Sequence, residues 1–179
     1  MTKAIYLAGP DVFLPDAVEI GRRKVALCAA YGFNGLFPLD SAIDPKARDA
    51  SLQIFHANQT MMDRADAIIA NLTPFRGPSA DAGTVYELGY MAGKGKRCFA
   101  YCNDPRIYAD RIVGITASGG IKIDRDGSTV EDFGHVDNLM MIHALDLHGA
   151  PLVTPTQMPS DIWRDLASFE QCLTIASAR

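Results

Sequence analysis

Cysteine and histidine are scarce in this chain of 179 residues, and neither forms a metal-binding pattern. The four cysteines make no Cys-x-x-Cys pair and no zinc spacing, and the four histidines make no His-Glu-x-x-His motif. We therefore predict no metal site and no disulfide framework, and we expect a reducing cytoplasm as the location. The residues concerned are Cys28, Cys98, Cys102, Cys172, His56, His135, His143 and His148.

Long apolar runs and clusters of positive charge are missing too. No uninterrupted apolar stretch approaches the roughly 20 residues that cross a bilayer, and the run at the start of the chain is too short for a secretory signal. The net charge is −4, with both signs mixed along the chain, whereas a nucleic-acid binder usually carries a basic face or tail. We expect no membrane and no nucleic acid as a partner, but a small, nearly neutral substrate.

Three common motifs of catalytic and nucleotide-binding domains are absent. The chain has no P-loop of the form Gly-x-x-x-x-Gly-Lys-Ser/Thr and no strand-linked Gly-x-Gly-x-x-Gly. It also lacks the Gly-x-Ser-x-Gly turn of α/β-hydrolases. These absences speak against a P-loop nucleotidase, a dinucleotide-dependent oxidoreductase and a serine hydrolase, and we predict no cofactor.

The residues that are present favour one globular domain over residues 1–179, since 48% are hydrophobic and 21% charged. Apolar runs predict strands at 3–8, 33–39, 66–72 and 97–102, and a fifth at 152–153. Helical periodicity predicts helices at 16–31, 47–65, 82–93, 106–113, 137–145 and 160–176, the last capped by Ser160. Residues 118–132 are expected to form a hairpin or a flap. This alternation predicts an α/β fold with a mainly parallel sheet between two helical layers.

The predicted sheet selects three segments before any motif is considered. Ligands of such sheets bind beyond the carboxyl ends of the strands. The segments that follow the first three strands are residues 9–13, 39–43 and 71–81. We expect the functional site where these segments meet.

The third of these segments leads into a helix flanked by two carboxylates, Asp81 and Glu87. One interpretation is structural. Thr84-x-x-Glu87 matches a capping box, in which the glutamate bonds back to the start of the helix, and Asp81 suits a turn. The residues alone leave this interpretation open.

The other interpretation is chemical. A glutamate in the first helical turn stays ionised in the positive field of the helix N-terminus. An ionised carboxylate attacks an anomeric carbon as that carbon gains oxocarbenium character. A 2-deoxy sugar forms such a cation more readily because it lacks the 2-hydroxyl, so a modest nucleophile suffices. The leaving base then needs a proton or a hydrogen bond from a nearby acid or amide.

Four stretches, in the same order along the chain, resemble the nucleoside 2-deoxyribosyltransferase family. The resemblance extends from residue 5 to about residue 145, and the third stretch is the most specific. The loop Thr-Pro-Phe-Arg-Gly is similar to the branch that includes protozoan members. The stretches are Ile5-Tyr6-Leu7-Ala8-Gly9-Pro10 with Phe13, then Asp-Ala-Ile-Ile-Ala-Asn-Leu-Thr-Pro-Phe-Arg-Gly at 66–77, Asp81-x-Gly83-Thr84-x-x-Glu87-x-Gly89, and Asn138-Leu139-Met140.

The resemblance implies a flavodoxin-like, or Rossmann-like, three-layer sandwich with a five-stranded sheet. It implies ping-pong transfer of 2-deoxyribose between the nucleobases of 2′-deoxynucleosides. Glu87 matches the family's nucleophile, which forms a covalent deoxyribosyl intermediate, and Tyr6 matches a tyrosine that orients it. Asp81 matches an aspartate that helps to hold the deoxyribose and base. Asn138 matches an asparagine donated to a neighbouring subunit's site, so a homo-oligomer, a dimer at least, is implied.

The remaining candidates are residues expected to contact substrate, and several have a structural alternative. Tyr6 and Phe13 are alternatively core aromatics, and Asp40 and Asn138 are alternatively caps of the elements that follow them. The candidate substrate-binding residues are Gly9, Phe13, Asp40, Asn58, Asp63, Phe75, Gly83, Asn138 and Met140.

The chain departs from the family pattern at two places. Many members carry a base-contacting aspartate where this chain has Asn58, and an amide cannot ionise. Asp63, further along the same predicted helix, is a candidate substitute. Several members also end in a tyrosine whose terminal carboxylate enters the site. This chain ends Ala-Ser-Ala-Arg, so we expect that contact to be missing.

Two other functions stay open. One is an N-glycoside hydrolase acting on nucleosides or 5′-monophosphates. Phosphate binding favours a loop of backbone N–H groups after the first strand, but Pro10 lacks an N–H and Asp11 repels phosphate. We therefore expect unphosphorylated substrates. The other is a nucleotide-sensing module without catalysis, and the set of Asp81, Glu87, Tyr6 and Asn138 argues against it.

Overall fold

Four parallel strands form the central sheet of the computed structural model, which describes residues 2–40, 43–44 and 46–178. They are β1 (Ala4–Ala8), β2 (Asn34–Leu36), β3 (Ala67–Asn71) and β4 (Arg97–Tyr101), in the spatial order β2-β1-β3-β4. Every residue of β3 is buried, because a central parallel strand is covered on both faces. The predicted α/β class and the parallel sheet are confirmed. Two residues of the predicted segment 39–43, at positions 41 and 42, lie outside the described residues.

The predicted fifth strand is only partly formed. Residues 149–153 run parallel to β4, but they pair with it as isolated bridges at Gly149 and Val153. Val153 accepts a hydrogen bond from the N–H of Cys102 at 2.9 Å and donates one to the carbonyl of Ala100 at 3.0 Å. Pro151 lies between the bridges and has no N–H to donate, which interrupts the ladder. The regular sheet therefore has four strands rather than five, in the flavodoxin-like order.

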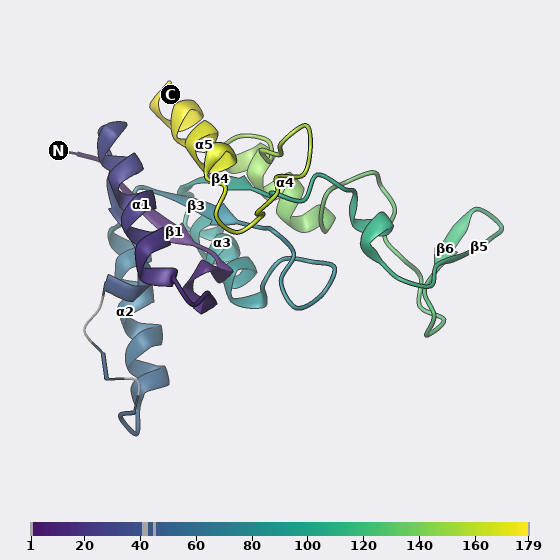
Figure 1. The fold of residues 1–179 in the computed structure, drawn as a ribbon, viewed down its shortest axis with the longest axis horizontal. Coiled ribbons are helices and arrows are strands. Elements are labelled where there is room, and N and C mark those ends of the chain that lie inside the picture. Colours follow the sequence, from purple (N-terminus) through teal and green to yellow (C-terminus); the bar gives the residue numbers. More distant parts are fainter. Residues whose placement is uncertain (1, 41–42, 45, 179) are drawn as a thin grey trace.

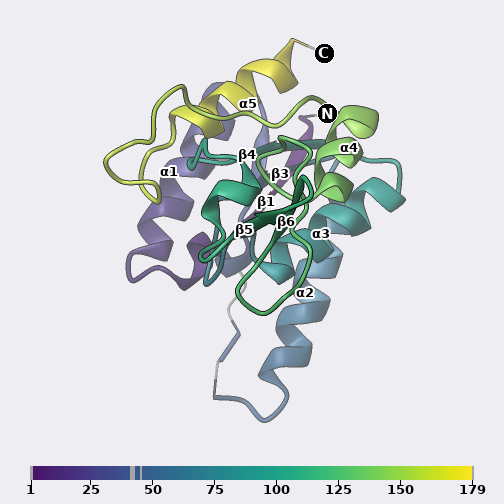
Figure 2. The ribbon, with the colours of Figure 1, turned by 90° about the vertical axis from the view of Figure 1, so that its right-hand side faces the viewer.

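Alternate side chains of the strands face two different helical layers. Ile5 and Leu7 of β1 pack toward α1 (Ala17–Ala30) and α5 (Ala167–Ser177). Tyr6 and Ala8 pack toward α2 (Ala50–Arg64), α3 (Ala82–Gly93) and α4 (Leu139–His148). Figure 2 shows the two helical layers on either side of the strands. The three-layer sandwich is confirmed, and its strand alternation directs Tyr6 toward α3.

Shorter elements complete the chain. Single 3₁₀ turns occur at η1 (Pro10–Phe13), η2 (Pro38–Asp40) and η3 (Tyr108–Arg111), so the helix expected at 106–113 is only one such turn. The hairpin expected at 118–132 lies earlier, as antiparallel strands β5 (Thr116–Ser118) and β6 (Ile121–Ile123), and only an isolated bridge from Ile123 to Thr129 follows it. The hairpin stands at the end of an arm that projects from the sandwich (Figure 1). Within the described ranges, no helix has the length and apolar character needed to span a bilayer.

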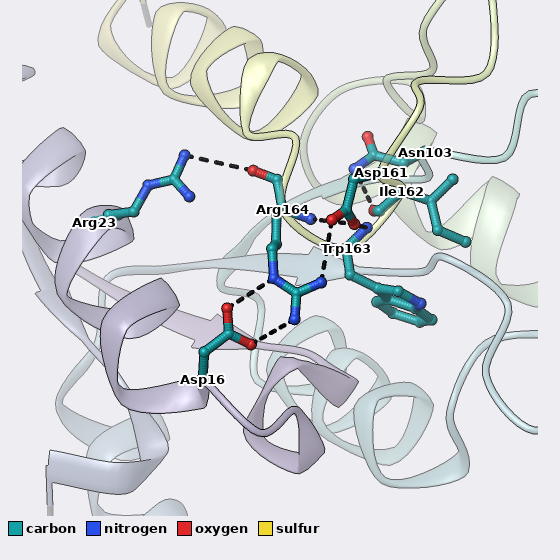
Figure 3. Close-up of polar contacts among 7 residues, drawn as sticks. All are labelled: Asp16, Arg23, Asn103, Asp161, Ile162, Trp163 and Arg164. Carbon is teal, nitrogen blue, oxygen red and sulfur yellow. Dashed lines mark hydrogen bonds and ion pairs between the residues drawn. The ribbon is translucent and has the colours of Figure 1, made fainter.

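The last helix starts later than its apolar periodicity predicts. It begins at Ala167, not at residue 160, and Ser160 is not its cap. Asp161 Oδ1 accepts hydrogen bonds from the N–H groups of Trp163 at 3.0 Å and Arg164 at 3.1 Å. The Arg164 guanidinium in turn bridges Asp161 and Asp16 (Figure 3). These side-chain bonds close a turn that competes with helix formation.

Candidate active site

A cavity of about 570 Å³ opens at the carboxyl ends of β1 and β3. The strand order reverses between these two strands, and such a switch point is where open α/β sheets bind ligands. Walls come from η1, η2, α2 and the start of α3. The volume is in the usual range for a small-molecule site. Six of the predicted site residues line it, namely Gly9, Phe13, Asn58, Asp81, Gly83 and Glu87.

Glu87 faces this cavity and is held by Tyr6 from the sheet. The Tyr6 hydroxyl, on a fully buried side chain, donates a hydrogen bond of 2.6 Å to Glu87 Oε1. The capping-box interpretation of Glu87 is wrong, because the N-cap of α3 is Asp81. Glu87 belongs to the second turn of the helix, from which its side chain reaches across to β1.

The expectation that the helix N-terminus keeps Glu87 ionised is also wrong. Since α3 begins at Ala82, Glu87 lies beyond the first turn, where the field of the helix terminus fades. Burial raises the pKa of the Glu87 carboxyl to about 7, the hydrogen bond from Tyr6 opposes that rise, and the charge of Asp81 adds to it. Burial also holds the pKa of Tyr6 well above its usual value. The tyrosine therefore stays protonated and donates to the carboxylate, which takes up and releases its proton near neutral pH.

Asp81 combines the two roles that its sequence position allows. Its Oδ2 accepts hydrogen bonds from the N–H of Thr84 at 3.1 Å and from the Thr84 hydroxyl at 3.3 Å. A Cβ on Gly83 would lie 3.1 Å from the same oxygen, so the glycine leaves room for this cap. Asp81 thus starts the helix and presents a carboxylate to the cavity that Glu87 lines.

The loop after β1 supplies the opposite wall. A Cβ on Gly9 would lie 2.4 Å from Asp11 Oδ2, so only glycine lets the chain fold this closely onto Asp11. Phe13 is 55% exposed and lines the cavity, which makes the core interpretation of Phe13 wrong. Phe75 is not among the described lining residues. It stacks on Phe13 with ring centroids 5.4 Å apart and so supports this wall from behind.

Asp11 does not face the cavity, and the expectation that it repels a phosphate there is wrong. It is 1% exposed and pairs with the equally buried Lys24 at 2.6 Å. Pro10 still lacks an N–H for an anion. Of the described residues that line the cavity, none is a lysine, arginine or histidine. This composition suits an uncharged ligand.

Asn58 and Asp63 have opposite surroundings although they share α2. Asn58 lines the cavity, and its Oδ1 is buried with no hydrogen-bond partner among the residues that the structure describes. Asp63 instead accepts hydrogen bonds from Lys94 and from the Tyr90 hydroxyl at 2.7 Å, on the outer side of α2 and α3. Its bond to Lys94 lowers the pKa of Asp63. Asp63 therefore fastens two helices together and does not stand in for Asn58.

Three other predicted residues lie outside this cavity. Asp40, the last residue of η2, accepts a hydrogen bond at 3.3 Å from the N–H of Phe37, which precedes that turn. Asn138 caps α4 through the N–H of Met140 at 3.0 Å, and its amide nitrogen donates to Glu131 at 2.8 Å. Met140 is 71% exposed. The capping alternative thus describes Asn138 within this chain. Asp40 instead bonds back to the residue before η2 and caps no element that follows it, since the N-cap of α2 is Asp49.

The lining residues that sequence reasoning missed are mostly apolar. The expectation that ligands bind beyond the carboxyl ends of the strands selected the segment that contains Leu39 and Ile43, but it identified neither side chain as a contact. Ile54 is 42% exposed on α2, off the buried face of that helix. No motif marks such residues, because only the facing of separate elements makes them a pocket. The missed residues are Val12, Val18, Pro38, Leu39, Ile43, Ile54 and Thr84.

The loop that joins β3 to α3 is fastened by a buried carboxylate that no motif indicated. Asp137, fully buried, accepts hydrogen bonds from the Ser79 hydroxyl and from the Ala80 N–H at 3.0 Å. Among the described residues, no group of three or more His, Cys, Asp or Glu side chains is placed to hold a metal ion.

Comparison with known proteins places this geometry in a family. The chain shares 34% identity over 155 residues with an uncharacterized protein of Schizosaccharomyces pombe, covering 76% of this chain and 74% of that one. It resembles the structure of a 2-desoxiribosyltransferase from Leishmania mexicana, with a TM-score of 0.67 and 30% identity over 96% of this chain and 97% of the other. A conserved protein from Enterococcus faecalis shares the fold, with a TM-score of 0.64 and 20% identity over the full length of both.

The family model of the nucleoside 2-deoxyribosyltransferases matches residues 5–140. That range begins in β1 with the strand of Tyr6 and ends at the start of α4. It includes all the described residues that line the cavity. The chain therefore belongs to the nucleoside 2-deoxyribosyltransferase family.

Proposed function

We propose that this protein transfers 2-deoxyribose from one nucleobase to another through a covalent intermediate on Glu87. One observation carries the proposal: the Glu87 carboxylate opens into a cavity of ligand size while the Tyr6 hydroxyl holds its Oε1 at 2.6 Å. Family membership supports the reaction class. The name of the Leishmania mexicana relative, a 2-desoxiribosyltransferase, supports the sugar.

The chemistry follows from the two carboxylates and the apolar walls. The ionised Glu87 oxygen attacks C1′ while the C1′–N bond breaks, and the base leaves with the bonding electrons and takes up a proton. The nitrogen of a second base then attacks C1′, loses a proton and regenerates the carboxylate. Asp81 stabilises positive charge at the sugar, and Phe13 offers an aromatic face to the base. Asn58 Oδ1 accepts a hydrogen bond from a donor on the base.

Base exchange tests the proposal directly. The protein is incubated with a 2′-deoxynucleoside and a different free base, and the products are separated by chromatography. We expect the exchanged nucleoside from the wild type and none from Glu87→Gln, a substitution that preserves shape. Release of free sugar alone, independent of the acceptor base, would reassign the protein as a hydrolase. Full exchange by Glu87→Gln would remove Glu87 from the reaction.

Trapping identifies the nucleophile independently. A 2-fluoro-2-deoxyarabinosyl nucleoside slows formation and breakdown of the intermediate, because fluorine destabilises an oxocarbenium-like transition state. We expect a mass increase of one fluorosugar on the peptide that contains Glu87. If the adduct were found on a peptide that contains Asp81 but not Glu87, Asp81 would be the nucleophile and Glu87 the supporting carboxylate.

A homo-oligomer in which Asn138 serves a neighbouring site is part of the proposal. The first half of α2 projects beyond the sheet (Figures 1 and 2), and its Leu52, Ile54 and Phe55 are 42–54% exposed. Such an apolar surface suits burial against a second copy. Asn138 is half-buried at the start of α4 and does not line this chain's own cavity.

Mixing two inactive variants tests the shared site. Asn138→Ser keeps a capping side chain for α4 but removes the amide, and Glu87→Gln removes the nucleophile. If Asn138 acts across an interface, refolding the two variants together restores activity, because some sites receive both native residues. A monomer in light scattering, or a mixture no more active than its parts, would contradict the shared site.

A further inference from the structure

Three aromatic side chains, Phe13, Phe75 and Trp163, pack in series as an aromatic wall, and Phe13 lines the cavity. The buried Lys24 pairs with Asp11, in the same short turn as Phe13. We propose that Lys24 is a positioning residue for this aromatic wall and acts on it through Asp11. Lys24 belongs to the layer of α1 and α5, on the opposite side of the sheet from Glu87. The kinetic part of this inference rests on the proposed function, whereas its spectroscopic part does not.

The buried ion pair is the first observation. Lys24 and Asp11 are 2% and 1% exposed, and the ammonium lies 2.6 Å from Asp11 Oδ2. The ammonium also lies 5.5 Å from the ring centre of Tyr101 and 5.4 Å from that of Phe169. Aromatic faces and one carboxylate therefore surround the charge. Asp11 belongs to η1, the same short turn that presents Phe13 to the cavity.

From Asp11 a chain of buried polar groups crosses the ends of the strands. Asn71 donates to Asp11 Oδ1 at 3.0 Å, and Asn71 Oδ1 accepts from the Thr73 N–H at 3.0 Å. The Thr73 hydroxyl accepts from the Asn103 N–H at 3.0 Å. All four residues are at most 1% exposed. The loops that follow β1, β3 and β4 are thus linked by one network.

The network ends on the turn that carries Trp163. Asn103 Nδ2 donates to the carbonyls of Ile162 at 2.8 Å and Asp165 at 3.0 Å, and Figure 3 shows the first of these beside Trp163. Asn103 therefore holds the carbonyls on both sides of this tryptophan. The position of the Trp163 ring follows from the same buried network that begins at Lys24.

An aromatic chain returns from Trp163 to η1 above this network. The rings of Trp163 and Phe75 meet edge to face at 5.8 Å, and Phe75 stacks on Phe13 at 5.4 Å. The Arg76 guanidinium covers both phenylalanine rings, 4.6 Å from the centre of Phe75 and 5.2 Å from that of Phe13. The polar chain and the aromatic chain both run between η1 and the turn that carries Trp163, so together they link these two segments twice. Lys24 neutralises the buried Asp11 carboxylate, which joins the two chains at η1.

Removing Lys24 leaves the Asp11 carboxylate buried without its ion-pair partner. A buried unpaired charge either moves toward solvent or draws water into the interior. Either response displaces η1, and with it Phe13 and the rings stacked behind. Glu87 and Tyr6 lie on the other side of the sheet and keep their hydrogen bond. The expected defect is therefore in the binding of the base and not in the titration of Glu87.

The test compares Lys24→Met with Lys94→Met, a matched lysine change in a half-exposed ion pair with Asp63. Trp163 is the only tryptophan, so its fluorescence reports on the wall without any substrate. For Lys24→Met we expect altered Trp163 emission, a KM for the deoxynucleoside raised about tenfold or more, and an unchanged pH midpoint of the rate. Lys94→Met should match the wild type in all three. The double variant Lys24→Met with Asp11→Asn, which strands no charge, should recover most of the KM and the emission.

A folded Lys24→Met protein with wild-type emission and KM would overturn the inference. If Lys24→Met does not fold, Asn71→Ala breaks the same chain without stranding a charge on Lys24. It should reproduce the emission change and the higher KM, and wild-type values for it would equally overturn the inference. If the wild type transfers no deoxyribose, the proposed function fails, while the emission of Trp163 still decides the role of Lys24.

Discussion

The Tyr6 hydroxyl lies 2.6 Å from Glu87 Oε1 and joins the first strand to the third helix, whose Glu87 lines the cavity. Tyr6 donates this bond, since burial raises its pKa well above the usual value. The bond favours the charged form of Glu87, whereas burial favours the neutral form. The balance leaves the pKa of Glu87 at about 7, where a carboxylate still ionises at neutral pH and is poorly solvated, as a nucleophile requires.

Tyr6→Phe should shift the pH dependence of transfer upward. If Glu87 attacks as a carboxylate, kcat/KM of the wild type rises with pH through a midpoint near 7. Without the hydroxyl the ionised form loses its hydrogen bond, so the midpoint moves to higher pH and the rate at neutral pH falls. Rate profiles of both proteins with one deoxynucleoside and one acceptor base measure the shift. An unchanged midpoint would separate Tyr6 from the ionisation of Glu87.

Glu87→Gln should stabilise the protein in mildly alkaline solution. The pKa of Glu87 is raised from 4.5 to about 7 by folding, so the folded state holds this proton more tightly than the unfolded chain. That contribution is fully present below pH 4.5 and is lost as the pH rises through 7. Relative to the wild type, the variant should gain about 3 kcal/mol of unfolding free energy between acid and alkaline pH. Urea unfolding at both ends of this range measures it, and a pH-independent difference would show that folding leaves this pKa unchanged.

Two substitutions separate the role of Asp81 as a helix cap from its role as a charge beside Glu87. Asp81→Asn keeps a capping oxygen for Thr84 but removes the charge, whereas Asp81→Ala removes both. Both should lower the midpoint of the pH profile, because the Asp81 charge raises the pKa of Glu87. Only Asp81→Ala should lose about 1 kcal/mol of stability, the usual contribution of an N-cap. Equal stability losses in thermal unfolding would contradict the division of roles.

Asn58 and Asp63 form a natural pair for testing base recognition. Asn58 Oδ1 is buried at the cavity and has no partner in the described part of the chain, whereas Asp63 is bound elsewhere by Tyr90 and Lys94. Asn58→Ala should raise KM for the deoxynucleoside about tenfold, since it removes one buried hydrogen bond to the ligand. Asp63→Ala should leave KM unchanged. Steady-state kinetics with several bases decide the matter, and the reverse result would restore Asp63 as the base contact.

Local sequence information was sufficient for most of the secondary structure. The buried run at 66–72 became β3, and the small-residue helix at 82–93 was predicted at both of its ends. Departures occur where a distant residue or a side chain intervenes. The last helix begins at Ala167 because Asp161 closes a turn and Arg164 reaches Asp16 on α1. Pro151 leaves the fifth strand as two isolated bridges.

The site shows the same division. By itself the sequence determined the parallel sheet, the segments at its carboxyl edge and the presence of Asp81 and Glu87 there, because strand periodicity and motif spacing are local. Only the tertiary structure decided that Glu87 turns to Tyr6 and not to its own helix start. It also decided that Asp11 is buried against Lys24 and that Asn58, not Asp63, faces the cavity. Each of these outcomes depends on which side chains separate elements bring together, and on the high free energy of leaving a buried polar group unpaired.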